Sequence, residues 1–253
     1  MWRTLKFTNL LKNSNAVILY NLITYPKILR NFYFLLMTIE KLVMTKLSFN
    51  TPAKLPFSYF LNQDVIFLAK DLLGKVLFTQ IDGKITAGII VETEAYFGVH
   101  DKASHAYGGR RTDRTETLYS QGGISYVYLC YGIHHLFNIV SSVEGEPHAV
   151  LIRGIEPLIG KDIMEERRKM SASKGAISAG PGSAAKALGI DRSFNKKDLG
   201  GDEIWVEDHG IRYKEEQIAA SPRVGVAYAQ DHALLPWRFF IKGNKYVSKP
   251  NKI

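Results

Sequence analysis

Two acids and an aromatic residue alternate with smaller residues in the segment VETEAYF, which runs from Val91 to Phe97. Because successive side chains of a strand point to opposite faces, we expect Glu92, Glu94 and Tyr96 to share one face. The apolar run AGIIV leads into this segment and predicts a buried strand. A carboxylate at the end of such a strand is a candidate general base, and a solvated acid on an edge strand is the alternative interpretation.

Three tyrosines follow in the segment SYVYLCYG, from Ser125 to Gly132. Strand alternation puts Tyr126 and Tyr128 on one face, while Tyr131 faces the other way beside the glycine. Such a cluster is typical of strand packing. Aromatic rings also stack on nucleic-acid bases for about 1–3 kcal/mol per base, and a tyrosine at the tip of a turn has the shape of a wedge. The residue types alone leave both interpretations open.

A polar loop is predicted between these two segments, at residues 98–123. It carries Arg110, Arg111 and Arg114, whose planar guanidinium groups suit bidentate contacts with phosphates. An exposed, flexible basic loop is the alternative for the same residues. His105, in the same loop, is either a ring in a pocket or a surface histidine.

Two polar residues stand inside apolar strand segments, Asn138 in LFNIV and Arg153 in AVLIRG. A charged side chain is costly to bury without a partner. We therefore expect an acid or an anionic ligand beside Arg153, and Glu94 is the obvious candidate for that acid.

The sequence predicts neither a metal site nor a disulfide. Cys130 is the single cysteine, which excludes an internal disulfide and a cysteine-based zinc site. His134 and His135 are adjacent, so on a strand they point to opposite faces and can hardly both bind one ion. No third ligand lies at a suitable spacing. We therefore expect no metal site.

The charge of the chain is unevenly distributed. The 253 residues carry a formal net charge of +9, from 33 basic and 24 acidic residues. Seven of the bases and one of the acids lie in residues 1–47, so the remainder holds 26 bases and 23 acids, a net charge of +3. A positive charge favours an anionic partner, but the remainder must then bind nucleic acid through a local basic patch.

Residues 1–49 form a basic, apolar leader that differs from residues 50–253. Its longest apolar run, FYFLLM, is far shorter than the roughly 18–20 residues of a membrane span. No small-residue cleavage site follows that run, so we expect no secretory signal. Three interpretations stay open: translation from the internal Met37 or Met44, a targeting or membrane-surface segment, or a structural part of the fold.

Helices and strands alternate along the part of the chain that must position these residues. Apolar residues at 65, 68, 69, 72 and 73 share one helix face, with Asp64 as N-cap and Gly74 as the stop. Asp82 and Gly83 predict a tight hairpin turn within residues 75–96. Further strands are predicted at 124–132, 134–142, 148–158, 222–228 and 237–244, and helices at 160–170 and at 180–190 with Ser183 as N-cap.

This interleaving has no regular βαβ period, which favours an α+β, or mixed α/β, fold with a curved, mostly antiparallel sheet flanked by helices. Hydrophobic residues make up 46% of the chain, enough for one core. No internal repeat and no low-complexity linker interrupts residues 50–253, so we expect them to form a single domain.

Six blocks of the sequence occur in the order VETEAY, YVYLCYG, FNIVSS, LIRGIEPL, GPG and PRVGVAYA…PWRFFIKGN. Together they resemble the alkyladenine (3-methyladenine) DNA glycosylases, also called methylpurine glycosylases, over about residues 53–248. The resemblance implies a single mixed α/β domain with a protruding hairpin. It also implies a monofunctional enzyme that needs no metal and no cofactor, flips a damaged nucleotide out of double-stranded DNA and lets water cleave the N-glycosidic bond. Its substrates would be alkylated or deaminated purines, of the 3-methyladenine and hypoxanthine class.

The resemblance also assigns roles to individual residues. It places the general base on Glu94, an arginine that helps to hold the water on Arg153, and a nearby backbone carbonyl at about Val224. Tyr131 matches the tyrosine that fills the gap left by the flipped base, and Asn138 matches the asparagine that discriminates against guanine. No lysine falls on the nucleophile position, so no lyase activity is implied. The residues that hold the flipped base fall on Tyr96, His105 and Tyr128.

Two other functions fit parts of the sequence. A non-enzymatic binder of damaged or distorted DNA would need only the wedge and the pocket. A nucleoside hydrolase that acts on small molecules would need the acid, but neither the wedge nor the basic loop. For the glycosylase we expect a monomer with no membrane partner for residues 50–253, acting in a bacterial cytoplasm or nucleoid, or in a eukaryotic nucleus.

Overall fold

The computed structural model describes residues 35–36, 38 and 52–249. The chain divides into two compact units, Met1–Thr51 and Pro52–Ile253. In the first unit the described residues, 35, 36 and 38, are helical. Most of the predicted leader, including Met37 and Met44, therefore lies outside the described residues.

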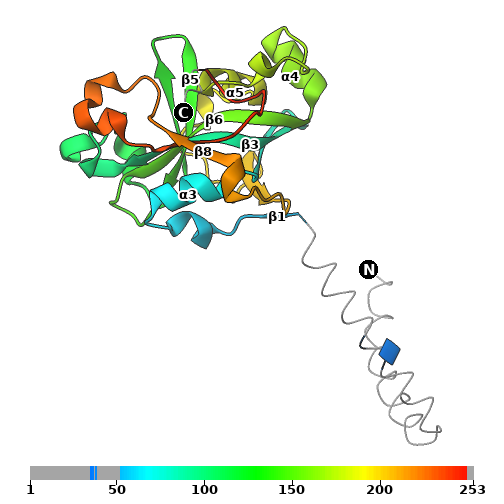
Figure 1. The fold of residues 1–253 in the computed structure, drawn as a ribbon, viewed down its shortest axis with the longest axis horizontal. Helices are drawn as coiled ribbons and strands as arrows, with labels where there is room; N and C mark the ends of the chain where they lie inside the picture. Colours follow the sequence, from blue (N-terminus) through cyan, green and yellow to red (C-terminus); the bar gives the residue numbers. More distant parts are fainter. Residues whose placement is uncertain (1–34, 37, 39–51, 250–253) are drawn as a thin grey trace, which may run out of the picture. The chain divides into compact units, whose positions relative to one another are not determined.

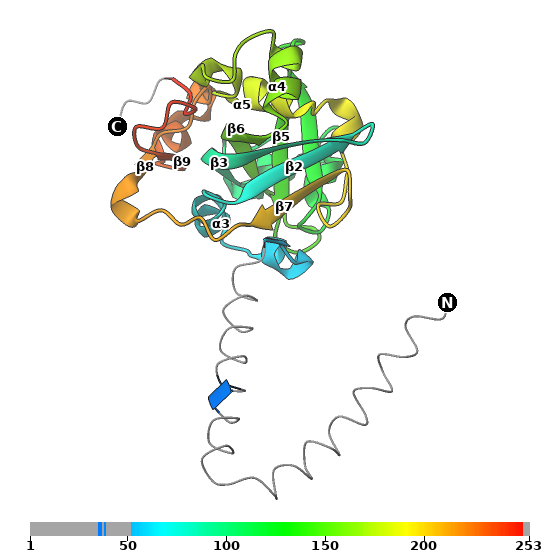
Figure 2. The same cartoon turned by 90° about the vertical axis from the view of Figure 1, so that its right-hand side faces the viewer.

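Nine described strands of the second unit form one sheet in which every pair is antiparallel (Figures 1 and 2). The strands are β1 (Ala53–Lys54), β2 (Val76–Ile81), β3 (Lys84–Phe97), β4 (Ser125–Cys130), β5 (His134–Ser141), β6 (His148–Ile159), β7 (Ile204–Asp208), β8 (Ile218–Ser221) and β9 (Arg238–Ile241). The main path runs β1-β7-β2-β3-β6-β5-β4, and β9 pairs with both β3 and β8. The predicted α+β fold with a mostly antiparallel sheet is confirmed.

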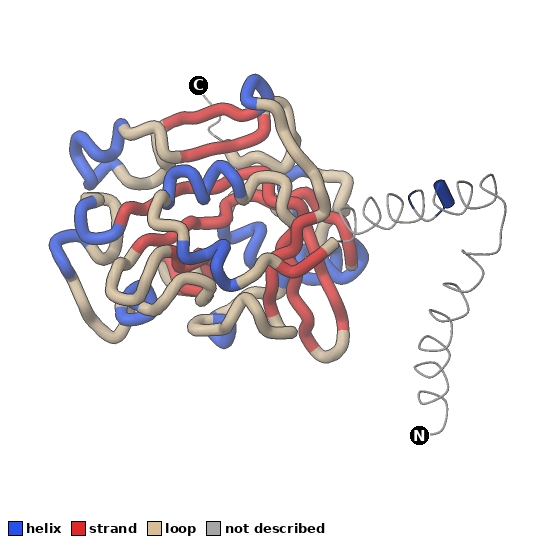
Figure 3. The backbone as a smooth tube through the Cα atoms, turned by 90° about the horizontal axis from the view of Figure 1, so that it is seen from below, coloured by secondary structure: helices blue, strands red, loops and turns tan. Residues whose placement is uncertain are grey.

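Three α-helices within residues 52–249 pack on this sheet, and short 3-10 turns interrupt the long loops (Figure 3). The helices are α3 (Val65–Asp71), α4 (Lys161–Arg168) and α5 (Pro181–Leu188). In Figures 1 and 2, α3 lies on the opposite side of β3 and β6 from α4 and α5. Leu68 of α3 and Leu188 of α5 are both buried in the main apolar core. The sheet is thus covered by helices on both sides, as predicted.

The first of these helices begins where the sequence predicts. Oδ1 of Asp64 accepts hydrogen bonds from the backbone N–H groups of Ile66 at 3.1 Å and Phe67 at 2.9 Å, which makes it the N-cap of α3. The helix ends at Asp71, earlier than the predicted stop at Gly74. The intervening residues form a turn, and the glycine has a φ of +91°.

The predicted N-cap of α5 is wrong. This helix begins at Pro181 after Gly180, and the Ser183 side chain caps no N–H group. Instead, the Ser183 hydroxyl accepts a hydrogen bond from Nη2 of Arg168 at 3.1 Å. Proline suits the first helical position because an N–H group there would have no partner within the helix.

Two tight hairpins connect neighbouring strands of the sheet. Asp82 and Gly83, with φ angles of +50° and +74°, join β2 to β3 and confirm the predicted turn. Tyr131, Gly132 and Ile133 join β4 to β5, and the first two, with φ angles of +51° and +73°, are the central residues of a turn closed by the hydrogen bond from Ile133 N–H to the Cys130 carbonyl. Positive φ angles at both central residues match the type I′ turn, whose twist suits a hairpin. A bulky residue rarely adopts this conformation, so Tyr131 occupies it at an energetic cost.

Residues 222–228 form no strand, contrary to the prediction. The backbone N–H of Val224 donates to the Glu94 side chain rather than to a neighbouring strand. Gly225 has a φ of +78°, which ends the extended run, and Ala227–Leu234 form 3-10 turns. The predicted strand at 237–244 is confirmed in part, as β9 (Arg238–Ile241). Strand β7 was not predicted from the sequence.

A bulge in the β3–β6 pair directs an arginine toward the acids of β3. Glu92 pairs with Gly154, whereas Thr93 pairs with Ile152, so Arg153 is an extra residue on β6. Such a bulge bends the strand and re-aims a side chain. It therefore explains how an arginine inside an apolar strand reaches buried carboxylates.

The bulge also requires a residue without a side chain at Gly154. A Cβ atom there would lie 2.6 Å from the carbonyl oxygen of Tyr246 and 3.2 Å from Cβ of Glu92. Because the closest contact is with backbone, we expect Gly154→Ala to lower the free energy of unfolding by about 1–3 kcal/mol, measured by urea denaturation.

Gly200→Ala is the matched control for this prediction. The closest atom to a Cβ there is a carboxylate oxygen of Asp198 at 3.2 Å, which can move away. We expect a change of less than about 0.5 kcal/mol in this variant. A Gly154→Ala variant as stable as the wild type would contradict the packing described for the bulge.

Candidate active site

Glu94 is fully buried on β3, with 0% of its surface exposed. Its Oε1 accepts a hydrogen bond from the backbone N–H of Val224 at 2.7 Å and lies 3.2 Å from Nη1 of Arg153. Its Oε2 accepts a hydrogen bond from the hydroxyl of Tyr96 at 2.9 Å. The predicted contact between Glu94 and Arg153 is confirmed.

A cleft of about 610 Å³ opens beside this carboxylate. Tyr96, Arg153 and Val224, the three partners of Glu94, all line the cleft. Glu94 itself lies directly behind them. The volume falls within the roughly 300–1,000 Å³ that is typical of small-molecule sites.

Glu92 lies on the same side of β3 as Glu94, as strand alternation predicts, because both contact Arg153. Its Oε1 accepts hydrogen bonds of 2.7 Å from Nε of Arg153, Nε of Arg238 and the hydroxyl of Ser248. Its Oε2 accepts one from the backbone N–H of Ser248 at 2.6 Å. Burial acts to raise the pKa of Glu92, but the charges of the two arginines and the hydrogen bonds outweigh it and lower that pKa. Glu92 had no predicted role, and neither Arg238 nor Ser248 was predicted from the sequence to be a site residue.

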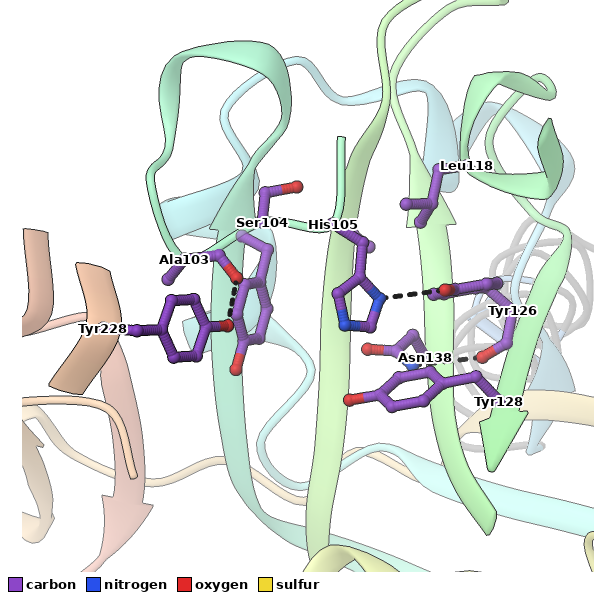
Figure 4. Close-up of a pocket in the computed structure, with 10 residues that line it drawn as sticks. Ala103, Ser104, His105, Leu118, Tyr126, Tyr128, Asn138 and Tyr228 are labelled. Carbon is purple, nitrogen blue, oxygen red and sulfur yellow. Dashed lines mark hydrogen bonds between the residues drawn. The ribbon is translucent and has the colours of Figure 1, made fainter. Parts of the chain in front are cut away.

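An aromatic pocket adjoins the cleft (Figure 4). The ring centroids of Tyr126 and Tyr128 lie 5.4 Å apart, so the face predicted for both tyrosines is confirmed. His105 lies edge-on to Tyr128 at 4.7 Å, and its Nδ1 shares a hydrogen bond of 2.9 Å with the Tyr126 hydroxyl. Nδ2 of Asn138 donates to the Tyr126 carbonyl at 3.1 Å. These contacts fix the orientation of both polar side chains at the pocket.

Tyr96 forms another wall of the pocket and rests on a buried ion pair. The guanidinium carbon of Arg223 lies 4.8 Å from the centroid of the Tyr96 ring and 5.0 Å from that of Trp237. The same guanidinium pairs with both carboxylate oxygens of Asp101. Burial and the charge of Glu94 raise the pKa of Tyr96, so its hydroxyl stays protonated and donates to that carboxylate.

Tyr228 also lines the pocket and the cleft. Figure 4 shows its ring on the opposite side of the pocket from Tyr126 and Tyr128. Its hydroxyl donates to the carbonyl of Ala103 at 3.0 Å, and the residue is 65% exposed. The sequence analysis missed this residue because it assigned residues 222–228 to a strand.

The three arginines of the polar loop take different positions. The guanidinium carbon of Arg114 lies 5.1 Å from the centroid of the Tyr128 ring, and the residue lines the cleft. Arg111 forms a bidentate pair with Glu116, with distances of 2.8 and 2.7 Å. The side chain of Arg110 is exposed. Only Arg114 among them is therefore placed at the cleft.

Tyr131 stands at the tip of the β4–β5 hairpin, which projects beyond the sheet in Figure 1, and it lines the edge of the cleft. It is 89% exposed, and the neighbouring Ile133 is 72% exposed. The predicted position at the tip of a turn is confirmed. An exposed aromatic ring in a costly backbone conformation gains nothing from packing, which indicates a function outside the folded core.

Among the residues that the structure describes, no three or more His, Cys, Asp or Glu side chains are grouped as they would be around a metal ion. Within residues 35–36, 38 and 52–249, no helix combines the length and the apolar character needed to cross a bilayer.

Comparison with known proteins gives this site a context. The sequence profile of the methylpurine-DNA glycosylase (MPG) family matches residues 59–245. A protein of Chlamydia felis is 47% identical over 200 residues, which are 79% of this chain and 100% of the relative. Proteins of Clostridium perfringens and Desulfitobacterium hafniense are 46% and 42% identical over 75% of this chain and 97% and 96% of the relatives. All three carry the name "Putative 3-methyladenine DNA glycosylase".

The chain belongs to the methylpurine-DNA glycosylase family. It is accordingly a hydrolytic DNA glycosylase of the 3-methyladenine type, and DNA is its substrate. The structure of this glycosylase brings most of the predicted site residues to one cleft and its pocket, while Arg110 and Arg111 lie elsewhere in the loop. The residues that gather there are Glu94, Tyr96, His105, Arg114, Tyr128, Tyr131, Asn138, Arg153 and Val224. Their individual roles stay predictions.

His105 of the glycosylase is held neutral by its surroundings. Burial, reinforced by the positive charges of Arg114 and Arg110, lowers the pKa of His105 to about 4. A neutral imidazole can accept or donate a hydrogen bond at the pocket, and it adds no positive charge there.

This pKa makes a prediction about stability. The unfolded chain binds a proton at His105 near pH 6.5, whereas the folded protein binds it only near pH 4, so stability falls as pH falls through this window. The loss by pH 4.5 is on the order of 2–3 kcal/mol. Between pH 7 and 4.5 the free energy of unfolding, measured by urea denaturation, should therefore fall less in His105→Gln than in the wild type. The difference between the two proteins should equal this loss. An NMR titration with a His105 midpoint near 6.5 would show that the ring is not held neutral.

Proposed function

We propose that this glycosylase uses Glu94 to activate the water that cleaves the N-glycosidic bond of a flipped, damaged purine nucleotide. The observation that carries the proposal is the buried carboxylate directly behind the cleft, whose three partners all line that cleft. Nη1 of Arg153 lies 3.2 Å from its Oε1 and the N–H of Val224 donates to the same oxygen, so both contacts hold the carboxylate in place as a proton acceptor.

The chemical step follows from this arrangement. The bond between C1′ of the sugar and the purine nitrogen breaks, and its electron pair leaves with the purine. The water oxygen forms the new bond to C1′, and a water proton passes to Glu94. The sugar is positively charged while the bond breaks, and the nearby negative carboxylate stabilises that charge.

The hydrogen bonds of Glu94 support one position for the attacking water. An ionised carboxylate can accept about four hydrogen bonds. Oε1 already contacts Val224 and Arg153, whereas Oε2 accepts one hydrogen bond, from Tyr96. The remaining acceptor position is therefore on Oε2. Since Tyr96 lines the cleft, we infer that the water reaches the carboxylate beside the tyrosine hydroxyl.

The aromatic pocket suits the flipped base. We propose that Tyr96 and Tyr128 stack on the purine, with His105 at the same pocket, because each base–ring contact contributes about 1–3 kcal/mol. Stacking on electron-rich rings favours an electron-poor, alkylated purine such as 3-methyladenine. The proposal also includes a deaminated purine such as hypoxanthine, because the neutral His105 and the Tyr96 hydroxyl are polar groups at the pocket.

The exposed hairpin and the basic loop suit the duplex. Flipping a nucleotide costs a few kcal/mol, and the ring of Tyr131 in the vacated stack would offset part of that cost. Arg110, Arg111 and Arg114 are the proposed phosphate contacts. Arg111 must then exchange Glu116 for a phosphate, which is inexpensive because the side chains of this pair are 57% and 46% exposed.

We assign this activity to residues 50–253, because the family match at 59–245 lies within them. The relatives named above are bacterial, which supports the bacterial cytoplasm or nucleoid as the place of action. A monomer is sufficient for the proposed site, since all its residues come from one chain.

Glu94→Gln tests the role of the carboxylate. The amide keeps the size of the side chain but cannot accept a proton, so we expect single-turnover release of 3-methyladenine or hypoxanthine to fall by about 10²–10⁴-fold. The Kd for the same duplex should change little, because the pocket and wedge are intact. Glu207→Gln, on β7, is the control and should release the base at the wild-type rate. Wild-type release by Glu94→Gln would rule out the carboxylate as the base.

Asn138→Ser tests substrate choice. Its amide is fixed at the pocket by the Tyr126 carbonyl, where it would clash with the 2-amino group of a guanine. We expect the serine variant to release alkylated guanine faster relative to hypoxanthine, by about tenfold, in single-turnover assays on matched duplexes. The hypoxanthine rate of the same variant serves as the internal control, and an unchanged ratio would count against the assigned role.

A further inference from the structure

Glu92, the other buried acid of β3, has no role in the proposed mechanism. Glu92 has 0% of its surface exposed, so it contacts neither the cleft nor solvent. All four hydrogen bonds to its carboxylate come from Arg153, Arg238 and Ser248. Glu92 can therefore affect the reaction only through the groups that it binds.

Glu92 controls how the guanidinium of Arg153 meets Glu94. Nε of Arg153 donates to Glu92 at 2.7 Å, and Nη2 donates to the Ser248 hydroxyl at 3.1 Å. Only Nη1 faces Glu94, at 3.2 Å. An arginine beside a lone carboxylate favours a bidentate pair that uses two nitrogens. The contacts with Glu92 and Ser248 prevent that pair, because they occupy the other two nitrogens.

The charges of this cluster are balanced. Glu92 and Glu94 carry two negative charges, and Arg153 and Arg238 carry two positive charges, at no more than 5% exposure each. Arg238 also donates to the carbonyl of Ser248 at 2.9 Å. Removal of the Glu92 charge would leave one net positive charge beside Glu94, in a buried environment where charges interact strongly.

We propose that Glu92 is a positioning residue that acts with Ser248. It holds Arg153 in a single, end-on contact with Glu94, which leaves that carboxylate enough negative charge to activate water and to stabilise a positively charged sugar. The inference rests on the proposed function, since it concerns how the arginine meets the same base.

Two variants test the inference by different routes. Glu92→Gln keeps the shape of the side chain and removes its charge. Ser248→Ala keeps all four charges and removes the hydroxyl that contacts both Glu92 and Arg153. Single-turnover base release should fall by about tenfold or more in Glu92→Gln and by a smaller factor in Ser248→Ala. Glu207→Gln is again the control with the wild-type rate.

Binding of two abasic-site analogues separates positioning from a general loss of structure. A duplex with a pyrrolidine analogue has a positive charge where the sugar becomes charged, whereas a tetrahydrofuran analogue is neutral. We expect Glu92→Gln to lose about tenfold in affinity for the charged analogue and to bind the neutral one like the wild type. Ser248→Ala should show the same selective loss of affinity. If Glu92→Gln does not fold, the result for Ser248→Ala alone tests the positioning role. Equal losses for both analogues, or none, would overturn the inference.

Glu94→Gln distinguishes a failure of this inference from a failure of the proposed function. If Glu94→Gln is inactive while Glu92→Gln and Ser248→Ala behave like the wild type, only the role of Glu92 is wrong. If Glu94→Gln releases the base at the wild-type rate, the proposed mechanism is wrong, and the positioning role fails with it.

Discussion

Two buried carboxylates and two buried guanidinium groups neutralise one another inside the sheet, and the geometry of the site depends on this arrangement. A charge is costly to bury alone, so Glu92, Glu94, Arg153 and Arg238 are stable in the interior only as a set. They come from β3, β6 and β9, and Ser248 completes the hydrogen bonds from the segment after β9. The cluster therefore fixes three strands and the end of the described chain in one register.

The same cluster also affects how a water molecule could reach Glu94, the proposed general base. Glu94 has no exposed surface, so bulk solvent does not contact it. Its partners Tyr96, Arg153 and Val224 separate it from the cleft. In the proposed mechanism, an individual water rather than bulk solvent would occupy the remaining acceptor position and attack a nucleotide that already fills the cleft. The ion pair of Asp101 and Arg223 supports two of these partners, since the Arg223 guanidinium lies against the ring of Tyr96 and Arg223 directly precedes Val224 in the chain.

Features of the fold that depend on a few neighbouring residues, such as helix caps and tight turns, could be predicted from the sequence. Asp64 caps its helix, and Asp82 and Gly83 make a hairpin turn, because a few adjacent residues decide both. Arg153 was expected to need an acid, because the cost of burying a charge does not depend on the fold. The roles of the site residues came from the resemblance to a family and not from spacing.

The contact of Glu94 with Arg153 was predicted, but the other long-range contacts of the site were not. Glu92 and Arg238 are 146 residues apart, and Asp101 and Arg223 are 122 residues apart. The alternating apolar residues of 222–228 predicted a strand, but the N–H of Val224 binds a side chain instead of a strand. An arginine inside the apolar run WRFFI was the available signal for Arg238, since it parallels the one that pointed to Arg153.

The most direct test of the account is the structure of the protein bound to a duplex that carries a non-cleavable analogue of a damaged purine nucleotide. The account predicts the flipped base against Tyr96 and Tyr128, with one water in hydrogen-bond contact with Oε2 of Glu94 and close to C1′. A flipped base in that cleft with Glu94 still sealed from any water, or with its carboxylate turned away from C1′, would contradict it.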